Sequence, residues 1–406
     1  MQIAETSMQI TESVDSLIKS EYNSPLDVKT EREFEMKEKL INALKNDTIL
    51  FVSGILAVIS CFIVTPDNKY TGYIDFRVLA ILFSLMLVVS ALMRIGTFDY
   101  LTSKLLGKIH SERYISLLLV VLAFFMSMLL TNDVTLVTLV PFAINVLKKY
   151  KDRRRTMYTL ILMTVSANLG SMLTPIGNPQ NLYLYSLYHM KLGSFILQML
   201  PFSTLSLLLL IVSVIILNIS DKTLDTAETD AVKAPKKLPL FVYIGLFIIC
   251  VLTVSNKIPA YVMLAVVCVV VLVFDRKAFA SVDYGLLLTF VFFFVLIGNL
   301  GRIDFIYSYL SAIVDKNATL AAILSSQIIS NVPAAMLLST FTKNGNALVL
   351  GANLGGLGTI IASMASLITY KFFNTIKKEG EHYLLAFTSV NVVFLVILFL
   401  FLLLIG

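Results

Sequence analysis

The sequence contains one acidic residue that lies well inside an apolar segment, Asp133 in the run Thr131-Asn132-Asp133. A charged carboxylate at membrane depth costs about 2.5–3.5 kcal/mol even on the more lenient insertion scale, so such a residue is functional by default. The chemistry open to it is binding a cation or carrying a proton. The alternative is a structural cap on the following helix, because Asp is also a favoured N-cap residue. Both roles are compatible.

Amides and hydroxyls at two helix-breaking motifs provide further cation ligands. Hard cations such as Na⁺ are satisfied by several neutral oxygens from side chains and from unwound backbone. We therefore predict cation or proton coupling, with Na⁺ as the candidate metal ion, at two clusters, the second without a carboxylate: Asp133, Asn132, Asn168 and Gly170, then Asn331, Asn353 and Gly355. The alternative is that the amides cap broken helix ends and bind no ion.

A third set of polar residues indicates an anion site. The run Gly177-Asn178-Pro179-Gln180-Asn181 has no polar counterpart in the second half, where residues 362–366 read Ala-Ser-Met-Ala-Ser. Helix N-termini present free N–H groups and a positive dipole end, which favour an anion. The predicted substrate-binding residues are Thr131, Asn132, Asn178, Gln180, Asn181, Ser330, Asn331, Ser363 and Ser366. The alternative is that these side chains join helices to one another by hydrogen bonds.

The composition indicates that these residues are positioned by membrane-spanning helices. Of the 406 residues, 57% are hydrophobic and only 14% are charged, and the mean hydropathy is +0.85. Soluble domains do not have this composition, so we predict an all-α polytopic protein in a lipid bilayer. The net charge of +6 does not indicate a nucleic-acid partner, because the basic residues cluster in loops between apolar spans.

The sequence does not carry the patterns of a known intramembrane enzyme. It has no His-Glu-x-x-His, no Gly-x-Ser-x-Gly and no phosphate-binding Gly-x-x-x-x-Gly-Lys. Its cysteines have neither paired nor metal-type spacing, and its histidines lie in loops or at span ends. We therefore predict no enzymatic activity and no cofactor other than bound Na⁺.

About nine full spans are expected, since roughly 20 apolar residues are needed to cross the hydrocarbon core. Helix breakers such as Gly170, Pro175 and Pro179 interrupt one of them. Freed backbone groups survive at membrane depth only where protein or a water-filled cavity surrounds them, so broken spans should line a site. The predicted spans are 48–65, 74–93, 157–189 (broken), 194–219, 238–254, 258–275, 284–300, 346–370 (broken) and 383–405.

Two further apolar segments, 115–147 and 318–342, each have a polar break in the middle. Each arm is expected to be too short to cross, since a span needs about 20 residues. We therefore predict two re-entrant hairpins, which enter and leave the membrane on one side and place their polar tips near its middle.

The two halves of the chain are expected to be repeats. Thr131-Asn132 matches Ser330-Asn331 at a shift of 199, and residues 167–170 match residues 352–355 at a shift of 185. Counting spans gives the repeats opposite orientations in the membrane. Inverted repeats with broken helices that meet near the midplane are typical of secondary transporters.

The predicted organisation follows from the repeats and from the Lys and Arg residues. The Lys and Arg residues gather on one face of the predicted membrane protein, most densely at Lys148–Arg155, and we interpret this run as a positive-inside anchor. The positive-inside rule then places the N-terminus in the cytoplasm and the C-terminus outside the plasma membrane. The segments are a cytoplasmic leader, either an interfacial helix or a solvated tail (1–46), a first repeat (47–219, with hairpin 115–147 and broken helix 157–189), a linker with one span (220–257) and a second repeat (258–406, with hairpin 318–342 and broken helix 346–370).

The motifs at these breaks resemble the ion transporter superfamily, which takes in citrate–metal transporters, divalent-anion/sodium symporters and arsenite efflux permeases. The resemblance covers about residues 48–406 and rests on Thr131-Asn132-Asp133, Ser330–Ala334, Asn168–Asn181 and Asn353–Ser363. It implies a homodimer in which a transport domain moves against a scaffold as an elevator. In the dicarboxylate branch, Ser-Asn-Thr tips bind the carboxylate and Na⁺. Here the tips read Thr-Asn-Asp, as in the arsenite branch, and Ser-Asn-Val.

The leading hypothesis is a secondary transporter of a small anion, coupled to Na⁺ or H⁺ through Asp133. The anion is an organic carboxylate such as citrate or a dicarboxylate, or an inorganic oxyanion such as arsenite. The alternative is a cation/proton antiporter of the same fold, which has no need of the polar Asn178–Asn181 run. A channel fits less well, because two opposed hairpins suit alternating access.

Overall fold

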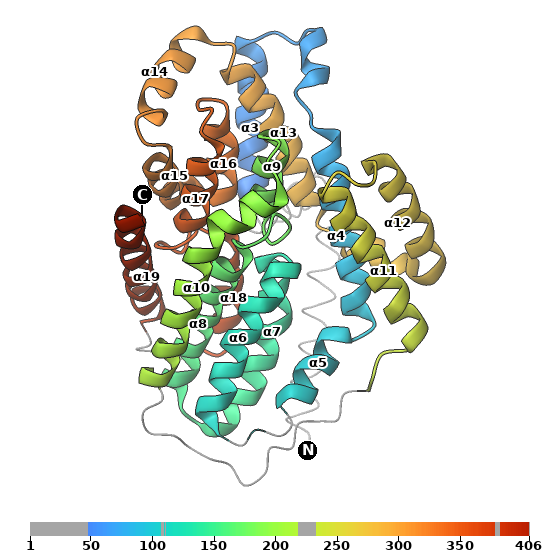
Figure 1. Cartoon of the computed structure of the whole chain (residues 1–406), viewed down its shortest axis with the longest axis vertical. Coiled ribbons are helices and arrows are strands. Elements are labelled where there is room, and N and C mark those ends of the chain that lie inside the picture. Colours follow the sequence, from blue (N-terminus) through green and yellow to red (C-terminus); the bar gives the residue numbers. More distant parts are fainter. Residues whose placement is uncertain (1–47, 107–108, 110, 218–232, 378–381, 406) are drawn as a thin grey trace, which may run out of the picture. The chain divides into compact units, whose positions relative to one another are not determined.

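The structure is a computed structural model that describes residues 48–106, 109, 111–217, 233–377 and 382–405 (Figure 1). The chain up to Leu56 and the chain from Ala57 onward form separate compact units, and every contact reported below lies within the second. All regular secondary structure in the described ranges is helical, which confirms the predicted all-α class. The leader predicted at 1–46 lies outside the described residues.

The same order of helices occurs twice, once on either side of α11 (Lys237–Val254). The first series is α3 (Thr48–Ile63), η1 (Asn68–Gly72), α4 (Phe76–Arg94), α5 (Thr97–Leu106), α6 (Glu112–Leu129), α7 (Asn132–Leu147), η2 (Lys148–Tyr150), α8 (Arg153–Ser171), α9 (Pro179–Leu187) and α10 (Leu192–Leu217). The second series is α12 (Ala260–Asp275), η3 (Arg276–Ser281), α13 (Tyr284–Leu300), α14 (Asp304–Val314), α15 (Ala318–Ile329), α16 (Asn331–Ser339), α17 (Gly345–Gly355), α18 (Met364–Asn374) and α19 (Tyr383–Ile405). The matching order supports two related halves; their relative orientation in a membrane stays a prediction.

Five helices in the described part of the chain are long and apolar enough to cross a membrane, namely α4, α6, α10, α11 and α19. The pair α13 and α14, bent by 102°, adds a sixth if it is counted as one span. The predicted spans 48–65 and 258–275 form helices α3 and α12 of 16 residues each, which reach about 24 Å. Length and composition therefore support a polytopic membrane protein without confirming nine full spans.

The helix breaks fall where the sequence predicts them. Helix α6 ends at Leu129 and α7 begins at Asn132, and α15 and α16 are separated by Ser330 alone. The broken spans divide into α8 with α9 and into α17 with α18. Around the first break, α6, α7 and α8 pack against one another, as α15, α16 and α17 do in the second half (Figure 1).

Two expectations are corrected. The prediction that each hairpin arm is too short to cross is wrong for α6, which has 18 residues and reaches about 27 Å. It starts a turn early because Ser111 caps it and Glu112 pairs with Arg155, at 2.8 Å. The loop expected at 94–114 contains helix α5, which at 10 residues is too short to stand out as an apolar span in the sequence.

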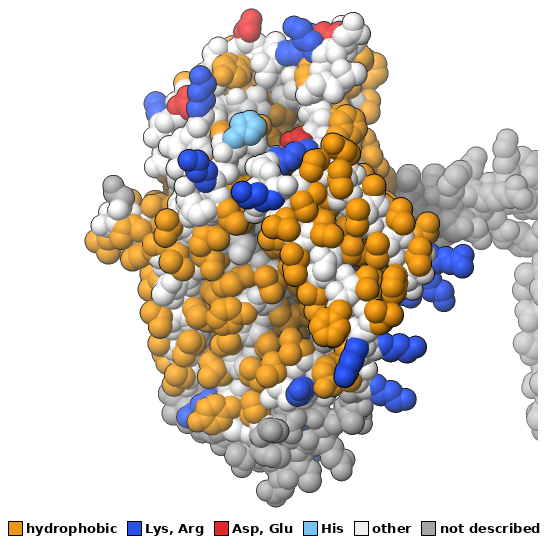
Figure 2. Space-filling view, turned by 45° about the vertical axis from the view of Figure 1, so that its right-hand side comes forward, with side chains coloured by type: hydrophobic (Ala, Val, Ile, Leu, Met, Phe, Trp, Pro, Cys, Tyr) orange, Lys and Arg blue, Asp and Glu red, His pale blue; other side chains and the backbone are white. Residues whose placement is uncertain are grey.

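The surface is apolar over a broad face. Figure 2 shows hydrophobic side chains gathered across it, with Lys and Arg at its borders. On α11 and α12, Phe241, Tyr261 and Val273 are 68%, 75% and 76% exposed. An exposed apolar surface of this kind marks contact with a membrane or a partner. Its occurrence on the span-length helix α11 and the shorter apolar helix α12 indicates lipid.

Two ion pairs join the halves reciprocally. Arg94 of the first half donates to Asp275 of the second, with Nε 2.6 Å from Oδ2. Arg302 of the second half donates to Asp67 of the first, at 2.8 and 3.1 Å. Each aspartate also caps a short 3₁₀ helix, through the backbone N–H of Lys69 or of Lys277. Asp67, Lys69 and Arg94 match Asp275, Lys277 and Arg302 at a shift of 208, so these contacts obey a pseudo-symmetry between the two halves.

The exposed Asp67–Arg302 pair predicts a small pH dependence. The hydrogen bonds from Arg302 hold the pKa of Asp67 below its usual 3.8. The pair therefore stabilises the fold above that pH, and the contribution is lost as the pH falls through the lowered pKa. We expect Arg302→Gln to lower the melting temperature slightly and equally from about pH 7 to about pH 5, with the difference shrinking below about pH 4.

Circular dichroism on the purified protein measures this difference. Lys343→Gln removes another exposed basic side chain and serves as the control. A difference between wild type and Arg302→Gln that grows on acidification would contradict the interpretation.

Candidate functional site

The backbone groups freed at the helix breaks are paired from one break to the next. The N–H of Asn132, at the tip between α6 and α7, donates to the carbonyl of Gly177 at 3.2 Å. The corresponding N–H of Asn331 donates to the carbonyl of Ala362 at 3.0 Å. The break between α6 and α7 therefore contacts the break between α8 and α9, and the break between α15 and α16 contacts the break between α17 and α18. These bonds satisfy backbone groups that would be costly to leave unpaired in a membrane.

Two threonines in register support the same junctions. Thr174 donates to the carbonyl of Met128 at 2.5 Å, and Thr359 donates to the carbonyl of Gln327 at 3.2 Å. Both members of each pair repeat, at the shifts of 185 and 199. The two junctions therefore share a hydrogen-bond pattern as well as an order of helices.

Asn168, near the end of α8, connects three of the four breaks. Its Oδ1 accepts from Asn132 Nδ2 at 2.9 Å and from Ser363 Oγ at 3.0 Å. Its Nδ2 donates to the carbonyl of Gly356 at 3.3 Å. The side chain is 3% exposed. A single buried amide thus joins the first hairpin tip to the broken span of the second half.

Asn353 makes the reciprocal connection from the second half. Its Nδ2 donates to Asn181 Oδ1 at 2.7 Å and to the carbonyl of Val349 at 2.8 Å. Its Oδ1 accepts from Asn178 Nδ2 at 3.4 Å. The pairs Asn168–Ser363 and Asn353–Asn178 exchange under the shift of 185, so this amide cluster has approximate two-fold symmetry.

Several buried polar atoms in and beside the amide cluster have no hydrogen-bond partner among the described residues. Leaving a buried polar group unpaired costs about 1–3 kcal/mol, so native proteins rarely do it without a water or ligand nearby. The unpaired atoms are Asp133 Oδ1, Asn178 Oδ1, both amide atoms of Gln180, Ser330 Oγ and Ser366 Oγ. These atoms come from both halves of the chain, and a ligand bound beside them would form hydrogen bonds that the protein itself does not supply.

The capping role considered for Asp133 belongs to its neighbour. Thr131 is the N-cap of α7, with its hydroxyl accepting from the N–H of Val134 at 3.4 Å. Asp133 lies in the first turn, and its own N–H donates to Asn132 Oδ1 at 2.9 Å. Its carboxylate is therefore available for a ligand, next to the positive end of the α7 dipole.

The second hairpin tip has a strained backbone. Ser330 has φ 73° and ψ 154°, a region that is essentially restricted to glycine. Thr131, at the matching position, has an ordinary φ of −68°. Strain of this kind persists where surrounding structure enforces it and clusters at ligand sites.

Two predicted coupling positions have a packing role. A Cβ at Gly170 would lie 2.2 Å from the carbonyl oxygen of Phe124, and one at Gly355 would lie 2.5 Å from Ser326 Oγ. The absence of a side chain lets α8 and α17 approach hairpin arms α6 and α15. This packing explains both glycines without an ion.

Sequence reasoning missed Gln327 and Ser171. Gln327 Nε2 donates to the carbonyls of Gly355 and Leu357 at 3.1 and 2.9 Å, and its Oε1 accepts from the N–H of Thr359 at 2.9 Å. Ser171 Oγ accepts from Asn178 Nδ2 at 2.7 Å. An isolated glutamine inside an apolar hairpin arm was the available signal for the first.

A cavity of about 650 Å³ lies between α4 and α13 on one side and α9 and α16 on the other. Its lining includes Asp75, Tyr183, Arg302 and Ser339. Tyr183 and Ser339 bond to each other at 2.8 Å between their hydroxyl oxygens. The cavity is large enough for a small carboxylate or oxyanion.

An all-helical chain with an apolar surface, interrupted helices and buried polar groups at the interruptions has the features of a membrane transporter. The chain belongs to the citrate transporter (CitMHS) family of the ion transporter superfamily, whose family model matches residues 38–344. This membership also confirms that the protein is a transporter and not an enzyme.

The chain is similar to several other transporters and membrane proteins. It is 34% identical to an uncharacterized transporter of Methanocaldococcus jannaschii over 84% of this chain and 94% of that one. It is 29% identical to the inner membrane protein YbiR of Escherichia coli over 78% of this chain and 85% of that one. It is 31% identical to the silicon efflux transporter LSI3 of Oryza sativa over 36% of this chain and 30% of that one.

Proposed function

We propose that this protein is a secondary active transporter of a small anion, coupled to Na⁺ or H⁺. The observation that carries the proposal is the set of unpaired buried atoms beside an amide cluster that joins both halves. The unpaired oxygens there are suited to binding a cation, and the amide and hydroxyl donors beside them are suited to binding an anion. Membership of the citrate transporter family supports an anionic substrate.

The topology of the proposal is an inverted repeat. Helices α6–α7 and α15–α16 form two re-entrant hairpins in this proposal, despite the 18-residue length of α6, because the polar tips pair with the breaks of other spans. One hairpin opens to the cytoplasm and the other to the outside, with the N-terminus inside. The repeats are 47–219 and 258–406, with 220–257 as linker. Alternating access takes place as an elevator within a homodimer. The cavity between α4 and α13 on one side and α9 and α16 on the other suits such a sliding boundary.

The proposed cation site centres on Asp133. Its Oδ1 is buried and without a described partner, and Asn132 and Asn168 are bonded to each other next to it. A carboxylate with neighbouring amide oxygens binds Na⁺, or alone carries a proton. Asn331 and Asn353 supply neutral oxygens in a second, weaker site.

The proposed anion site is made of donors at the breaks. Gln180, Ser330 and Ser366 have free hydrogen-bonding capacity, and the N-termini of α9 and α18 add dipole ends. Thr131, Asn178 and Ser363 lie at the borders of the site. Asn181 has both amide atoms engaged within the protein, so we assign it to positioning the site.

The substrate class divides into two branches. The citrate transporter family favours a di- or tricarboxylate. The Thr-Asn-Asp tip and the partial match to a silicon efflux transporter favour an inorganic oxyanion such as arsenite. A ligand screen separates these classes.

The screen measures the melting temperature of the purified protein with citrate, dicarboxylates, sulfate, phosphate and arsenite, each with and without Na⁺. A ligand that binds the folded state at a hundred times its Kd stabilises it by about 2.7 kcal/mol. We expect at least one anion to raise the melting temperature, more strongly with Na⁺ or at lower pH. No stabilisation by any anion under any condition would contradict the proposal.

The cation/proton antiporter remains the second candidate, because an unpaired Asp133 alone meets its needs. Gln180 distinguishes the two, since both its amide atoms are buried and free of described partners. We expect Gln180→Ala to weaken anion-driven transport about tenfold or more, as one lost hydrogen bond to a charged group costs about 1.5–3 kcal/mol.

Uptake into proteoliposomes measures the effect of Gln180→Ala. Gln198→Ala is the matched control, because the amide of Gln198 donates to the carbonyl of Asn346 at an exposed position. Unchanged transport by Gln180→Ala would favour the antiporter.

A further inference from the structure

A groove with a basic rim lies where the N-termini of α8 and α19 come together. It has a volume of about 430 Å³, and the two helices pack against each other. Arg153, Arg154 and His382 form its rim, and Met157, Tyr158 and Leu385 form its walls. Leu385 is 70% exposed, so the walls offer apolar surface to an occupant.

The basic and the apolar residues of this groove are separated along its length. The basic residues stand at the first positions of α8 and just before α19, and the apolar residues follow within the next two turns. At 1.5 Å per residue, the apolar walls extend about 8–12 Å beyond the rim. The headgroup region on each side of a bilayer is about 5–8 Å thick, so a headgroup at the rim would place its acyl chain along the apolar walls.

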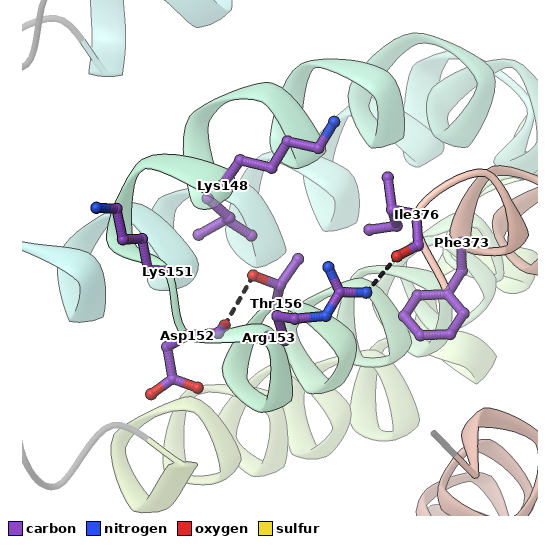
Figure 3. Close-up of a pocket in the computed structure, with 8 residues that line it drawn as sticks. Lys148, Lys151, Asp152, Arg153, Thr156, Phe373 and Ile376 are labelled. Atoms are coloured by element: carbon purple, nitrogen blue, oxygen red, sulfur yellow. Dashed lines mark hydrogen bonds between the residues drawn. The ribbon is translucent and has the colours of Figure 1, made fainter. Parts of the chain in front are cut away.

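A second cavity adds positive charge beside the rim. It has a volume of about 270 Å³, shares Arg153 with the groove and is also lined by Lys148 and Lys151 (Figure 3). Arg153 reaches across it and donates to the carbonyl of Ile376 (Figure 3). Asp152 also lines this cavity and pairs with Arg155 at 3.2 Å. Three basic side chains, Lys148, Lys151 and Arg153, outnumber this one carboxylate in the lining.

We propose that this basic groove binds an anionic phospholipid. The headgroup phosphate lies at Arg153 and Arg154, and one acyl chain lies along Tyr158 and Leu385. Arg154 is already held over the ring of Tyr158, 5.9 Å from its centroid, which positions its charge at the border between headgroup and chain. Two helix N-termini at the same end add to the attraction for phosphate.

The Lys148–Arg155 run thereby acquires a role beyond orienting the chain. A headgroup bound between α8 and α19 links α19 to the helix that carries Asn168 of the amide cluster. Basic pockets between membrane helices commonly hold anionic headgroups. The inference does not depend on the substrate or on the coupling ion.

The test is native mass spectrometry and thermal stability of the purified, delipidated full-length protein. Micelles contain either phosphatidylglycerol or the zwitterionic phosphatidylcholine, and a third arm contains inorganic phosphate. The variants are Arg154→Gln, which removes rim charge, and Ser389→Phe, which fills the groove without changing charge. Arg276→Gln removes an exposed arginine outside the groove and is the control.

We expect phosphatidylglycerol alone to remain bound and to raise the melting temperature. Arg154→Gln should weaken its binding about fivefold, the effect of one charge near a lipid surface, and Ser389→Phe by at least as much. Arg276→Gln should bind like wild type. If Arg154→Gln changes the melting temperature of the lipid-free protein, the binding of phosphatidylglycerol by Ser389→Phe decides whether the groove holds the lipid.

Three results would overturn the proposal. The first is equal retention of phosphatidylcholine, which would make the groove an unselective lipid contact. The second is equal weakening by Arg276→Gln. The third is stabilisation by inorganic phosphate that matches that of phosphatidylglycerol and persists in Ser389→Phe, which would identify a soluble anion as the occupant.

Discussion

Replacing Asp133 by Asn abolishes ion-coupled transport while the protein stays folded. Asp133 Oδ1 is buried without a described partner, and the helix cap is supplied by Thr131, so the fold does not need the charge. Removing a charge from a membrane interior relieves a cost of about 2.5–3.5 kcal/mol on the lenient scale. Transport should fall by at least about a hundredfold, since losing a charged ligand typically costs 3 kcal/mol or more.

Proteoliposomes with imposed Na⁺ or pH gradients measure the loss, and melting temperature reports the fold. Asp304→Asn, at the start of α14, is the control, because it also removes one carboxylate from the first turn of a helix. Coupled transport at wild-type rate by Asp133→Asn would contradict the coupling role. A melting temperature that falls sharply would show that the carboxylate is structural.

Replacing Gly170 by Ala destabilises the protein more than any other single methyl addition considered. The new Cβ would lie 2.2 Å from the carbonyl oxygen of Phe124 and 2.6 Å from Ser127 Oγ. Since a backbone atom cannot rotate away, α8 must move from hairpin arm α6. Overpacking a tight interface costs about 1–3 kcal/mol and occasionally more, and the displaced α8 carries Asn168 out of the amide cluster.

Two other glycines calibrate this result. Gly355→Ala meets Ser326 Oγ at 2.5 Å and Ser326 Cβ at 2.8 Å, and its nearest backbone atom is the carbonyl oxygen of Ala322 at 3.1 Å. Because that backbone contact is longer than the 2.2 Å contact at Gly170, the cost of Gly355→Ala should be smaller. Gly245→Ala in α11 meets nothing within 4 Å and should be neutral or stabilising by up to about 1 kcal/mol. Thermal unfolding in detergent ranks the three. Equal stability of Gly170→Ala and Gly245→Ala would show that α6 and α8 are not closely packed.

Helix breaks could be predicted from the sequence because their residue types act locally. Proline and glycine weaken helices locally, and single ones such as Pro141 in α7 and Pro201 in α10 are tolerated. The breaks near Asn132, Asn168, Asn331 and Asn353 could be predicted because polar or helix-weakening residues cluster there within apolar segments. The repeat also indicated that these amides correspond. The structure adds that they bond crosswise, with Asn168 to Ser363 and Asn353 to Asn178.

Other features depend on contacts that are distant in sequence. The pairing of Arg94 with Asp275 and of Arg302 with Asp67 joins residues from different halves, and no local pattern specifies such partners. The length of α6 depended on a buried ion pair with Arg155. The sequence predicts Asn181 as a substrate ligand, but in the structure its amide forms hydrogen bonds within the protein. Whether an amide bonds to the protein or to a ligand depends on tertiary contacts that the sequence does not specify.

Binding of a cation and an anion at one shared polar site is the central feature of the proposed transporter, and reciprocal binding measurements test it most directly. Titration calorimetry on the purified protein gives the affinity for the anion found in the screen, with and without the cation. It also gives the affinity for the cation, with and without the anion. Linkage requires that each ligand change the affinity for the other by the same factor. We predict a factor of at least about five in wild type and of one in Asp133→Asn. Independent affinities in wild type, or unchanged coupling in Asp133→Asn, would contradict the account.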